Sequence, residues 1–309
     1  MREKRICFFN TNQAWGGGEK WHLTAAKAFA EAGYHVFAGV NRNSVLAQRL
    51  GSEFIDATLT LSVSNLSFLN PFKLIAITRF LRHHRVNAIV LNLPIDLKLA
   101  GIAARWAGVG RIVFRRGMAV PVRNSVLNRY LYQRVVTHVI ANSREIKRTI
   151  LSHNKSLCPA NKLHVIYNGV ELNTFPDTSQ TPTNTVPVIG NASRLVAQKG
   201  QSYLLKMAAE LDRRGVAFKL VIGGKGALEE ALKQEAVELG ITHKVEFCGF
   251  IEDMNAFFKS IDIYVLSSLH EGTANTAIEA MAWQKAMVGF DISSTPELIA
   301  HNETGFLAP

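Results

Sequence analysis

Short apolar runs alternate with longer amphipathic stretches along almost the whole chain. Continuous apolar runs of this length are typical of parallel strands that are covered by helices on both faces. In the first half, the pattern predicts helices over residues 20–32 and 71–84. The strands predicted in this half are RICFFN, HVFAGV, NAIVLNL, RIVFRR, THVIAN and LHVIYN.

The alternation breaks once and then resumes. Residues 176–187, PDTSQTPTNTVP, are rich in Pro, Thr and Ser and have no hydrophobic period, which is typical of a linker. The second series of predicted strands is VPVIGNAS, FKLVIGG, KVEFCGF, IDIYVLSS, KAMVGFD and TGFLA.

These patterns predict an α/β fold with two Rossmann-like, doubly wound domains, residues 1–175 and 188–309, joined by the linker 176–187. A length of 309 residues suits two domains. Two such domains face a cleft between the carboxyl ends of their strands, the usual ligand site of these sheets. The final run TGFLAP has no helix after it to cover an apolar strand, so we expect the C-terminal domain to be incomplete and truncated at Pro309.

Positive charge is concentrated in one half of the chain. The net charge is +11, and residues 1–180 carry 24 Lys and Arg against 9 Asp and Glu, whereas residues 181–309 carry 11 against 15. A one-sided basic surface favours a polyanionic partner, which is a nucleic acid, an anionic lipid surface or a phosphorylated substrate. A basic face that is merely solvated would give the same excess, so charge alone leaves these alternatives open.

The sequence signals of membrane insertion and export are missing. No apolar run approaches the ~20 residues of a membrane-spanning helix, and the N-terminus has no signal-peptide core. We therefore expect a cytoplasmic protein, whose contact with a membrane would be peripheral, at the inner face of the cytoplasmic membrane. Phe68, Phe72 and Phe80 are interpreted as helix core and not as a lipid slot.

The stretch SSLHEGTANTAIEAMA predicts an anion site at the start of a helix. The strand IDIYVLSS leads into a tight loop over residues 269–273, and a helix over residues 275–284 follows, with Ile278, Met281 and Ala282 toward the sheet. The free amides of such a helix start can hold a phosphate. Glu271 and Glu279 cannot bind phosphate and are expected to accept hydrogen bonds from hydroxyls, so a sugar phosphate fits. Alternatively, Glu279 only stabilises the helix dipole.

A second candidate element is SRLVAQKG, which follows the first strand of the second domain. Arg194 and Lys199 flank its loop, where both could reach one diphosphate. A solvated lysine is the common alternative at such a position. Neither the dinucleotide fingerprint nor a GxxxxGK[ST] phosphate loop is present.

Six segments in order resemble one known family. SRLVAQKG, LVIGGKGALEEAL, VEFCGFIED, IDIYVLSSLHEGTANTAIEAMA, VGFDISSTPELI and NETGFL are similar to the donor domain of the retaining GT-B glycosyltransferases of family 4. The pair Glu271 and Glu279 resembles the EX7E signature of that family. The N-terminal half resembles it more loosely, at GGGEKW and VIYNGVEL.

The resemblance implies a role for each matching residue toward a nucleotide-diphosphate sugar. Arg194 and Lys199 would bind the diphosphate, Glu271 the hydroxyls of the donor sugar and Glu279 those of the ribose. The backbone of Gly272, Thr273, Ala274, Asn275 and Thr276 would bind the phosphates. Gly249 and Phe250 would lie near the nucleobase. Gly16, Gly17 and Gly18 would let the first domain approach the phosphates closely.

Catalysis in this family is expected to be electrostatic. Cations and amides stabilise the leaving β-phosphate, and no protein nucleophile is required. The resemblance implies no cofactor and no metal requirement, and the chain has no DxD motif to suggest otherwise. Cys7, Cys158 and Cys248 lack metal-ligand spacing and are interpreted as reduced core thiols.

The sequence departs from the family at two places. Arg115 and Arg116 stand where many relatives carry a histidine, and an arginine cannot act as a general base. We interpret them as ligands of a phosphate or of an anionic acceptor, or else one of them merely extends toward solvent at the strand end. The segment SSTPE has serines where the family often has two glycines, which leaves its contacts with the donor sugar open.

The function that these features predict is sugar transfer from a nucleotide-diphosphate sugar to an anionic glycan or lipid-linked acceptor, with retention, in cell-surface polysaccharide or lipopolysaccharide biosynthesis. The alternatives are a GT-B protein that binds nucleotide sugars without catalysis and a GT-B nucleotide-sugar epimerase. Nucleic-acid binding is disfavoured, because the aromatic residues are not interleaved with Arg and Lys.

Overall fold

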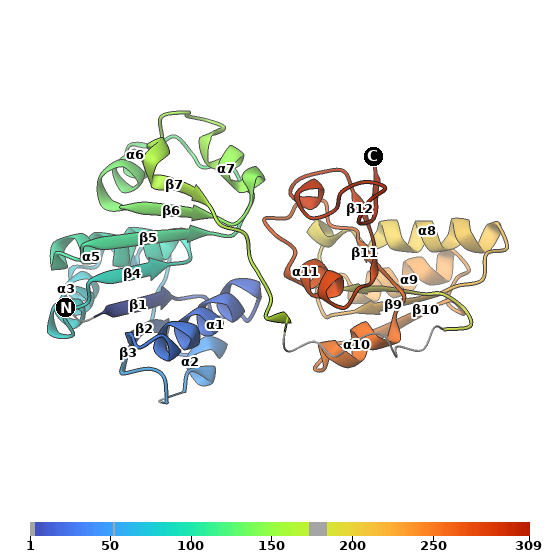
Figure 1. Ribbon diagram of the computed structural model, residues 1–309, viewed down its shortest axis with the longest axis horizontal. Coiled ribbons are helices and arrows are strands. Elements are labelled where there is room, and N and C mark those ends of the chain that lie inside the picture. The colour runs from blue at the N-terminus through green and yellow to red at the C-terminus, as the bar shows by residue number, and fades with distance from the viewer. Residues whose placement is uncertain (1–3, 52, 173–183) are drawn as a thin grey trace. The chain divides into compact units, whose positions relative to one another are not determined.

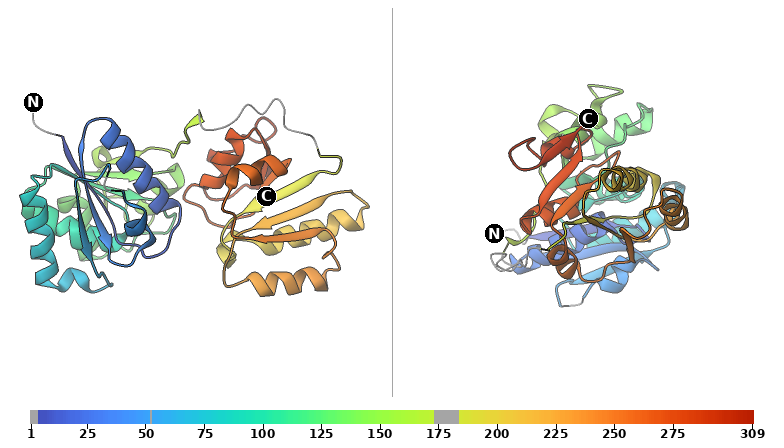
Figure 2. Two further views of the ribbon diagram at one scale, coloured as in Figure 1. Left: turned by 90° about the horizontal axis from the view of Figure 1, so that it is seen from below. Right: turned by 90° about the vertical axis from the view of Figure 1, so that its right-hand side faces the viewer.

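The computed structural model describes residues 4–51, 53–172 and 184–309. The chain forms two compact units, Met1–Tyr167 and Asn168–Pro309, called unit 1 and unit 2 below. Most of the predicted linker, residues 176–183, lies outside the described residues. Figures 1 and 2 show that each unit is a sheet with helices on both faces.

Unit 1 contains a parallel sheet in the order β3-β2-β1-β4-β5-β6-β7. All six strands predicted for this half are confirmed. The sequence pattern missed β3, because its threonines break the apolar run and the strand lies half-exposed at the sheet edge. The strands are β1 Arg5–Asn10, β2 His35–Asn41, β3 Ala57–Leu61, β4 Ala88–Leu91, β5 Arg111–Arg116, β6 His138–Ala141 and β7 Leu163–Val165.

Among the described residues of unit 1, four helices, α3 among them, begin after a residue whose side chain caps them. Asn70 accepts hydrogen bonds from the N–H groups of Phe72 and Lys73, and Pro71 opens α3, as is usual for a helix start. The elements are α1 Gly17–Glu31, α2 Val45–Arg49, η1 Ser67–Leu69, α3 Pro71–His83, α4 Pro94–Asp96, η2 Leu97–Gly101, α5 Ile102–Ala107, α6 Val126–Tyr130, η3 Leu131–Val135, α7 Arg144–Leu151 and η4 Ala160–Lys162.

Strand β1 shows why this unit is doubly wound. Successive strand residues point to opposite faces, and Cys7 and Phe9 join the core beneath α3, whereas Ile6 and Phe8 join the core beneath α1. Both faces of the sheet are therefore apolar, and both need a helical layer.

Unit 2 repeats this architecture in the order β10-β9-β8-β11-β12-β13, again parallel. All six strands predicted for this half are confirmed. On β11, Val265 packs beneath α8 and Leu266 beneath α11. The elements are β8 Val188–Ala192, η7 Ala197–Lys199, α8 Gln201–Arg213, β9 Lys219–Gly223, α9 Glu229–Glu238, β10 Val245–Gly249, α10 Met254–Ser260, β11 Ile263–Leu266, α11 Asn275–Ala282, β12 Ala286–Phe290, η8 Thr295–Glu297 and β13 Phe306–Ala308.

The buried face of α11 differs from the predicted one. Ala277 and Ala280 are fully buried, whereas Ile278 and Met281 of the predicted stripe are only half-buried. Alanines carry little bulk, so their face allows a helix to approach the sheet closely. The predicted stripe was wrong, because Ala282, like Ile278 and Met281, is only half-buried.

Two predicted core residues lie at the surface. Phe72 is 81% exposed, because α3 starts at Pro71 and buries the face of Leu74, Ile77 and Leu81 instead. Phe68 precedes the helix, so its spacing to Phe72 is not helical. Cys248 is also exposed, since β10 is an edge strand whose side chains alternate between the core and solvent.

No helix among the described residues is long and apolar enough to cross a membrane.

Candidate functional site

Three loops of unit 2 meet at the carboxyl edge of its sheet. They follow β8, β11 and β12, which are neighbours in the sheet, so the loops lie next to one another. The first loop carries Lys199, the second carries Glu271, and the third carries Ser293 and Ser294. The two residues that the sequence proposed for the diphosphate and the sugar hydroxyls therefore come from adjacent loops.

Lys199 and Glu271 form an ion pair through Nζ and Oε1. The side chains are 17% and 8% exposed, so water screens the pair only weakly. Each charge offsets the burial of the other, and removing either one would leave the remaining charge in an environment that disfavours it.

Hydrogen bonds to backbone carbonyls hold these two loops together. Ser267 Oγ donates to the carbonyl of Lys199 at 2.8 Å, and Leu269 N–H donates to the carbonyl of Gln198 at 2.9 Å. The side chain of Gln198 donates in turn to the carbonyl of His270 at 2.6 Å. Gly200 permits this approach, because its φ is 64° and a Cβ there would lie 2.2 Å from the Ser267 carbonyl oxygen.

The start of α11 lies in the second loop. Its N-cap residue is Ala274, whose side chain makes no capping hydrogen bond, so no cap side chain covers the first amides of the helix. Asn275 Oδ1 accepts a hydrogen bond from Asn168 at 2.7 Å, and Thr276 Oγ1 lies 2.7 Å from the hydroxyl of the buried Tyr264. Glu279 follows one helical turn later and is half-buried. This is the geometry in which a helix start binds an anion.

The serine hydroxyls of the segment SSTPE form hydrogen bonds with the protein backbone. Ser293 Oγ accepts a hydrogen bond from the N–H of Glu271 at 3.1 Å and lies 2.8 Å from its carbonyl oxygen. Ser294 Oγ donates to the same carbonyl at 3.1 Å. These hydroxyls therefore fix the backbone of the loop that carries Glu271.

Other residues proposed from the sequence form no hydrogen bond or ion pair with Lys199 or Glu271 among the described residues. The side chain of Arg194 is exposed, and its carbonyl accepts hydrogen bonds from Gln201 Nε2 at 2.9 Å and from the N–H of Val196 at 3.0 Å. Gly249 ends β10 with a φ of 66°, and the ring of the next residue, Phe250, is 59% exposed. β10 is the edge strand, separated from β8 by β9.

Unit 1 has a buried polar cluster at the carboxyl edge of its own sheet. Glu19, only 3% exposed, follows the glycine run that opens α1. Its Oε1 accepts from Asn10 Nδ2 at 3.1 Å and from Asn92 Nδ2 at 3.5 Å. A Cβ on Gly18 would lie 2.9 Å from Asn92 Nδ2, so a larger residue there would displace this side chain.

Arg115 is the cation of this cluster. It is 3% exposed, its guanidinium lies 4.2 Å from the ring centroid of Trp21, and it donates to Asn92 Oδ1 at 3.4 Å. Burial lowers the pKa of Arg115 to about 10, and the charge of Glu19 acts against that shift. The arginine therefore stays charged at neutral pH.

Arg116 points to the opposite face of the sheet, as the next residue on a strand must. It is 8% exposed, donates to the carbonyl of Val120, and has a buried Nε without a hydrogen-bond partner among the described residues. Neither arginine extends into solvent, and the two do not form one binding site.

Two further titratable groups lie beneath the same edge. Asp96 is fully buried and accepts from the Thr11 hydroxyl at 2.5 Å and from the Leu93 N–H at 3.0 Å. Burial raises its pKa to about 7, although these hydrogen bonds act to lower it. His22 is 1% exposed, and burial lowers its pKa to about 3.

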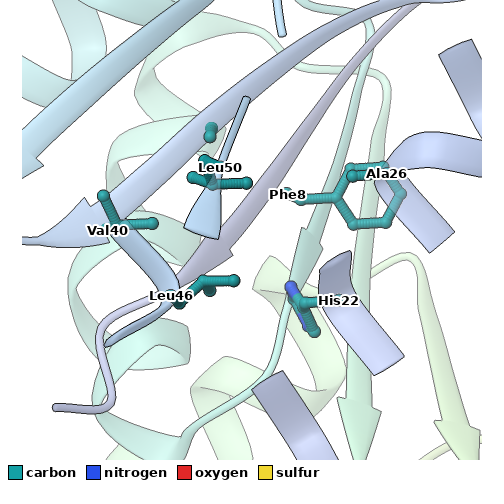
Figure 3. A pocket seen from close by; sticks show the side chains of 7 residues that line it. Phe8, His22, Ala26, Val40, Leu46 and Leu50 are labelled. Atoms are coloured by element: carbon teal, nitrogen blue, oxygen red, sulfur yellow. The ribbon is translucent and has the colours of Figure 1, made fainter. Parts of the chain in front are cut away.

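His22 lines a small pocket between α1 and α2. Figure 3 shows it beside Phe8, Leu46 and Leu50, all of them apolar. Neither ring nitrogen has a hydrogen-bond partner among the described residues. The imidazole ring of His22 makes edge-on contacts with two aromatic rings. Its centroid lies 5.7 Å from that of Phe8 and 5.4 Å from that of Trp21, so the neutral imidazole packs here as an aromatic ring.

Comparison with known families assigns both units. The family described as glycosyl transferases group 1 matches residues 177–309, and the one described as Glycosyltransferase Family 4 matches residues 15–174, more than half of the chain. The chain belongs to glycosyltransferase family 4. Its two parallel-sheet α/β units have the GT-B fold that the sequence predicted.

Curated glycosyltransferases are similar to the chain over part of their length. The chain is 30% identical to a putative glycosyltransferase, EpsF, of Bacillus subtilis over 39% of its length and 34% of that protein. It is 24% identical to the lipopolysaccharide core mannosyltransferase LpcC of Rhizobium leguminosarum over 59% of its length and 53% of that protein. The chain thus spans about a third to a half of these relatives.

A solved structure shows the same fold over almost the whole chain. The Anabaena protein HepE, crystallised with UDP and glucose, matches with a TM-score of 0.80 at 22% identity, over 99% of this chain and 86% of that one.

Several polar residues of the two units were not singled out from the sequence. Thr11 follows a predicted strand directly, and Asn92 lies near the end of another, so the rule that ligand sites lie at carboxyl strand ends could have found them. Glu19 follows the glycine run and could have been found by its position. Nothing local marks Ser267 or Gln198, because their partners lie about 70 residues away.

No group of three or more His, Cys, Asp or Glu side chains that could hold a metal ion occurs among residues 4–51, 53–172 and 184–309.

Proposed function

We propose that this chain is the core of a retaining glycosyltransferase that moves a sugar from a nucleotide-diphosphate donor to an anionic glycan or lipid-linked acceptor. The observation that carries the proposal is the buried pair of Lys199 and Glu271 beside the uncapped start of α11. This arrangement offers a cation and backbone amides for phosphate, and a carboxylate for sugar hydroxyls, within one group of loops.

The chemistry follows from these groups. The bond between the sugar anomeric carbon and the β-phosphate oxygen breaks, and a bond from that carbon to the acceptor oxygen forms on the same face. The acceptor proton passes to the departing phosphate. Lys199 and the amides of residues 272–276 stabilise the charge that develops on the phosphate, which is the largest catalytic contribution expected of such a site. Glu271 holds donor-sugar hydroxyls, and Glu279 holds the ribose.

The remaining donor contacts are assigned to exposed groups. Arg194 is free to turn toward the diphosphate, because its side chain lies in solvent. The exposed ring of Phe250 provides a surface on which a nucleobase can stack. The crystallised HepE complex, which contains UDP, supports a uracil nucleotide as the first to test.

The test is calorimetric titration of UDP, GDP, ADP and dTDP in the presence of EDTA. We expect one nucleotide to bind, and Lys199→Ala and Glu279→Gln to weaken it about tenfold or more, since each removes a charge-assisted contact. Lys219→Ala and Glu238→Gln are matched controls, because these exposed residues lie at the amino end of β9 and on the outer side of α9.

The outcomes separate the alternatives. Equal binding by wild-type and both site variants would contradict the proposed donor site. Binding without turnover of any nucleotide sugar would indicate a binding protein, and inversion at the anomeric carbon, read by NMR of the product, would contradict retention.

We also propose that unit 1 contacts an anionic membrane on which a lipid-linked acceptor resides. The segment from Leu66 to Ile75 exposes four large apolar side chains. Leu66 is 68% exposed, Leu69 66%, Phe72 81% and Ile75 43%. On α3 the stripe of Phe72 and Ile75 continues as Arg79 and Arg82, all on the solvent side.

Charge supports a negatively charged surface as the occupant. Residues 57–111 carry seven Lys and Arg, and their one acidic residue, Asp96, is fully buried. Apolar side chains that insert beside a row of cations fit the interface of an anionic bilayer.

Co-sedimentation with vesicles tests this contact. We expect binding to phosphatidylglycerol-containing vesicles, weak binding to pure phosphatidylcholine, and loss of binding in Leu69→Ser/Phe72→Ser and in Arg79→Ala/Arg82→Ala. Val237→Ser, an exposed apolar residue of unit 2, is the matched control. Equal binding to both vesicle types, or full binding by both double variants, would contradict the membrane contact.

A further inference from the structure

Ser293 combines an unfavourable backbone conformation with a contact to a candidate catalytic residue. Its φ is 56°, in the left-handed region that residues other than glycine seldom adopt. Its hydroxyl accepts from the N–H of Glu271 at 3.1 Å and donates to the carbonyl of Glu271 at 2.8 Å. One hydroxyl therefore binds both backbone groups of Glu271.

The loop of Glu271 is held from two sides. From the β12 side, Ser293 and the buried Ser294 bind its backbone. From the β8 side, the carbonyls of Gln198 and Lys199 accept hydrogen bonds from Leu269 N–H and Ser267 Oγ. Because β8, β11 and β12 are neighbouring strands, this loop cannot shift without breaking contacts on one side.

Other positive-φ residues of unit 2 have an ordinary explanation. Gln284 follows the end of α11, and Asn302 lies in a turn whose N–H bonds to the carbonyl of Gly305. Asparagine is several-fold enriched in this conformation, and helix ends commonly adopt it. Serine lacks that preference, and a glycine at position 293 would remove the strain. Strain that persists beside a functional site usually serves that site.

We propose that Ser293 is a positioning residue, whose hydroxyl fixes the peptide groups of Glu271 so that its carboxylate stays beside Lys199 and faces the donor sugar. The role toward the sugar rests on the proposed function, whereas the hydroxyl contact is a property of unit 2 alone. Ser293 touches no substrate in this account. It therefore affects the turnover of the donor more than the affinity for the nucleotide.

Three variants separate the hydroxyl from the strain. Ser293→Ala removes the hydroxyl and keeps a Cβ at positive φ, whereas Ser293→Gly removes both. Asn302→Gly is the matched control, because it relieves a φ of 65° in the same unit. Each variant is compared with wild-type by amide hydrogen exchange of residues 267–276, by Tm, by nucleotide titration and by hydrolysis of the nucleotide sugar.

We expect hydrogen exchange of residues 267–276 to become about tenfold faster in both Ser293 variants and to stay unchanged in Asn302→Gly. The Tm of Ser293→Gly should exceed that of Ser293→Ala, since glycine relieves the strain. Donor hydrolysis should fall about tenfold in both, while the Kd of the nucleotide stays within about twofold of wild-type.

The outcomes distinguish this inference from the proposed function. Unchanged exchange in both Ser293 variants overturns the hydroxyl contact, whatever nucleotide the wild-type binds. Faster exchange with unchanged hydrolysis overturns the positioning role. A wild-type protein that binds no nucleotide contradicts the proposed function and with it the positioning role, and the exchange data then still decide whether the hydroxyl holds the loop.

Discussion

The carboxyl edges of the two sheets carry polar groups in contrasting ways. In unit 2, Lys199 and Glu271 lie on two loops that hydrogen bonds to backbone carbonyls hold together, and the start of α11 lacks a capping side chain. In unit 1, Glu19 and Arg115 are almost fully buried among asparagines and an aromatic ring. The first arrangement leaves the start of α11 without a capping side chain, whereas in the second the polar side chains bind one another.

This difference suits the edge of unit 2 to ligand binding and the cluster of unit 1 to stabilising its own fold. Under the proposed function, Lys199 contacts a diphosphate while it remains beside Glu271, so this pair must stay open to a ligand. The buried cluster of unit 1 is satisfied internally, so removing a member chiefly costs stability. Four predictions test this contrast, from the largest expected effect to the smallest.

The largest effect is expected for Lys199→Ala. We expect turnover to fall about 10²- to 10³-fold, the range seen when one stabilising group of a transition state is lost. Steady-state kinetics with a nucleotide sugar measures this. The variant also leaves Glu271 buried and unpaired, and Lys199→Met/Glu271→Gln should recover the lost stability but not the turnover. Recovered turnover in the double variant would show that the pair is only structural.

Glu19→Gln should mainly destabilise unit 1. It leaves the cation of Arg115 buried without its carboxylate, and breaking such a buried interaction costs about 3 kcal/mol. Denaturant unfolding measures the change. Glu145→Gln is the control, because the pair of Glu145 with Arg148 lies at the surface. Equal stability of the two variants would mean that Glu19 does not support Arg115.

His22 should make unit 1 sensitive to acid. Its pKa is about 3 when folded, against 6.5 when unfolded, so its contribution to stability is complete above pH 6.5 and is lost as the pH falls from there toward 3. The slope is at most about 1.4 kcal/mol per pH unit. We expect His22→Leu to remove that slope, as measured by unfolding at pH 7 and pH 5.

Asp96 has a pH dependence of the opposite sign. Its folded pKa of about 7 lies above its unfolded value of 3.8, so its contribution is lost as the pH rises through that interval. Both wild-type and His22→Leu retain Asp96, so its contribution to the pH dependence of stability cancels when the two proteins are compared. His153→Leu, an exposed histidine of the same unit, should leave the slope unchanged, and a wild-type slope in His22→Leu would disprove the assignment.

The smallest effect is expected for Phe72→Ser. The side chain is 81% exposed, so the free energy of unfolding should change by less than about 0.5 kcal/mol. Thermal unfolding measures it. Phe9→Ser, in the buried core, should by contrast lower stability by several kcal/mol or prevent folding. A large loss in Phe72→Ser would mean that another part of the protein covers this ring.

Local patterns determined the fold class and the strands of both units. Runs such as RICFFN and IDIYVLSS predict buried parallel strands because every residue of such a strand faces a helical layer. The pattern did not predict the strand at Ala57–Leu61, because at a sheet edge one face of the strand needs no apolar residues. The sequence also failed to predict the burial of Ala277 and the exposure of Phe72, since both depend on where a helix begins and how closely it packs.

For the site, the sequence by itself determined which residues have suitable chemistry and that they follow strands. Glu271, Lys199 and the glycine run were found in this way. Only the tertiary structure decided that Lys199 pairs with Glu271, that Arg115 and Arg116 point to opposite faces, and that Ser293 holds a backbone 22 residues away. The reason is physical: parallel strands that are neighbours in the sheet are distant along the chain, so contacts at their carboxyl ends leave no local pattern.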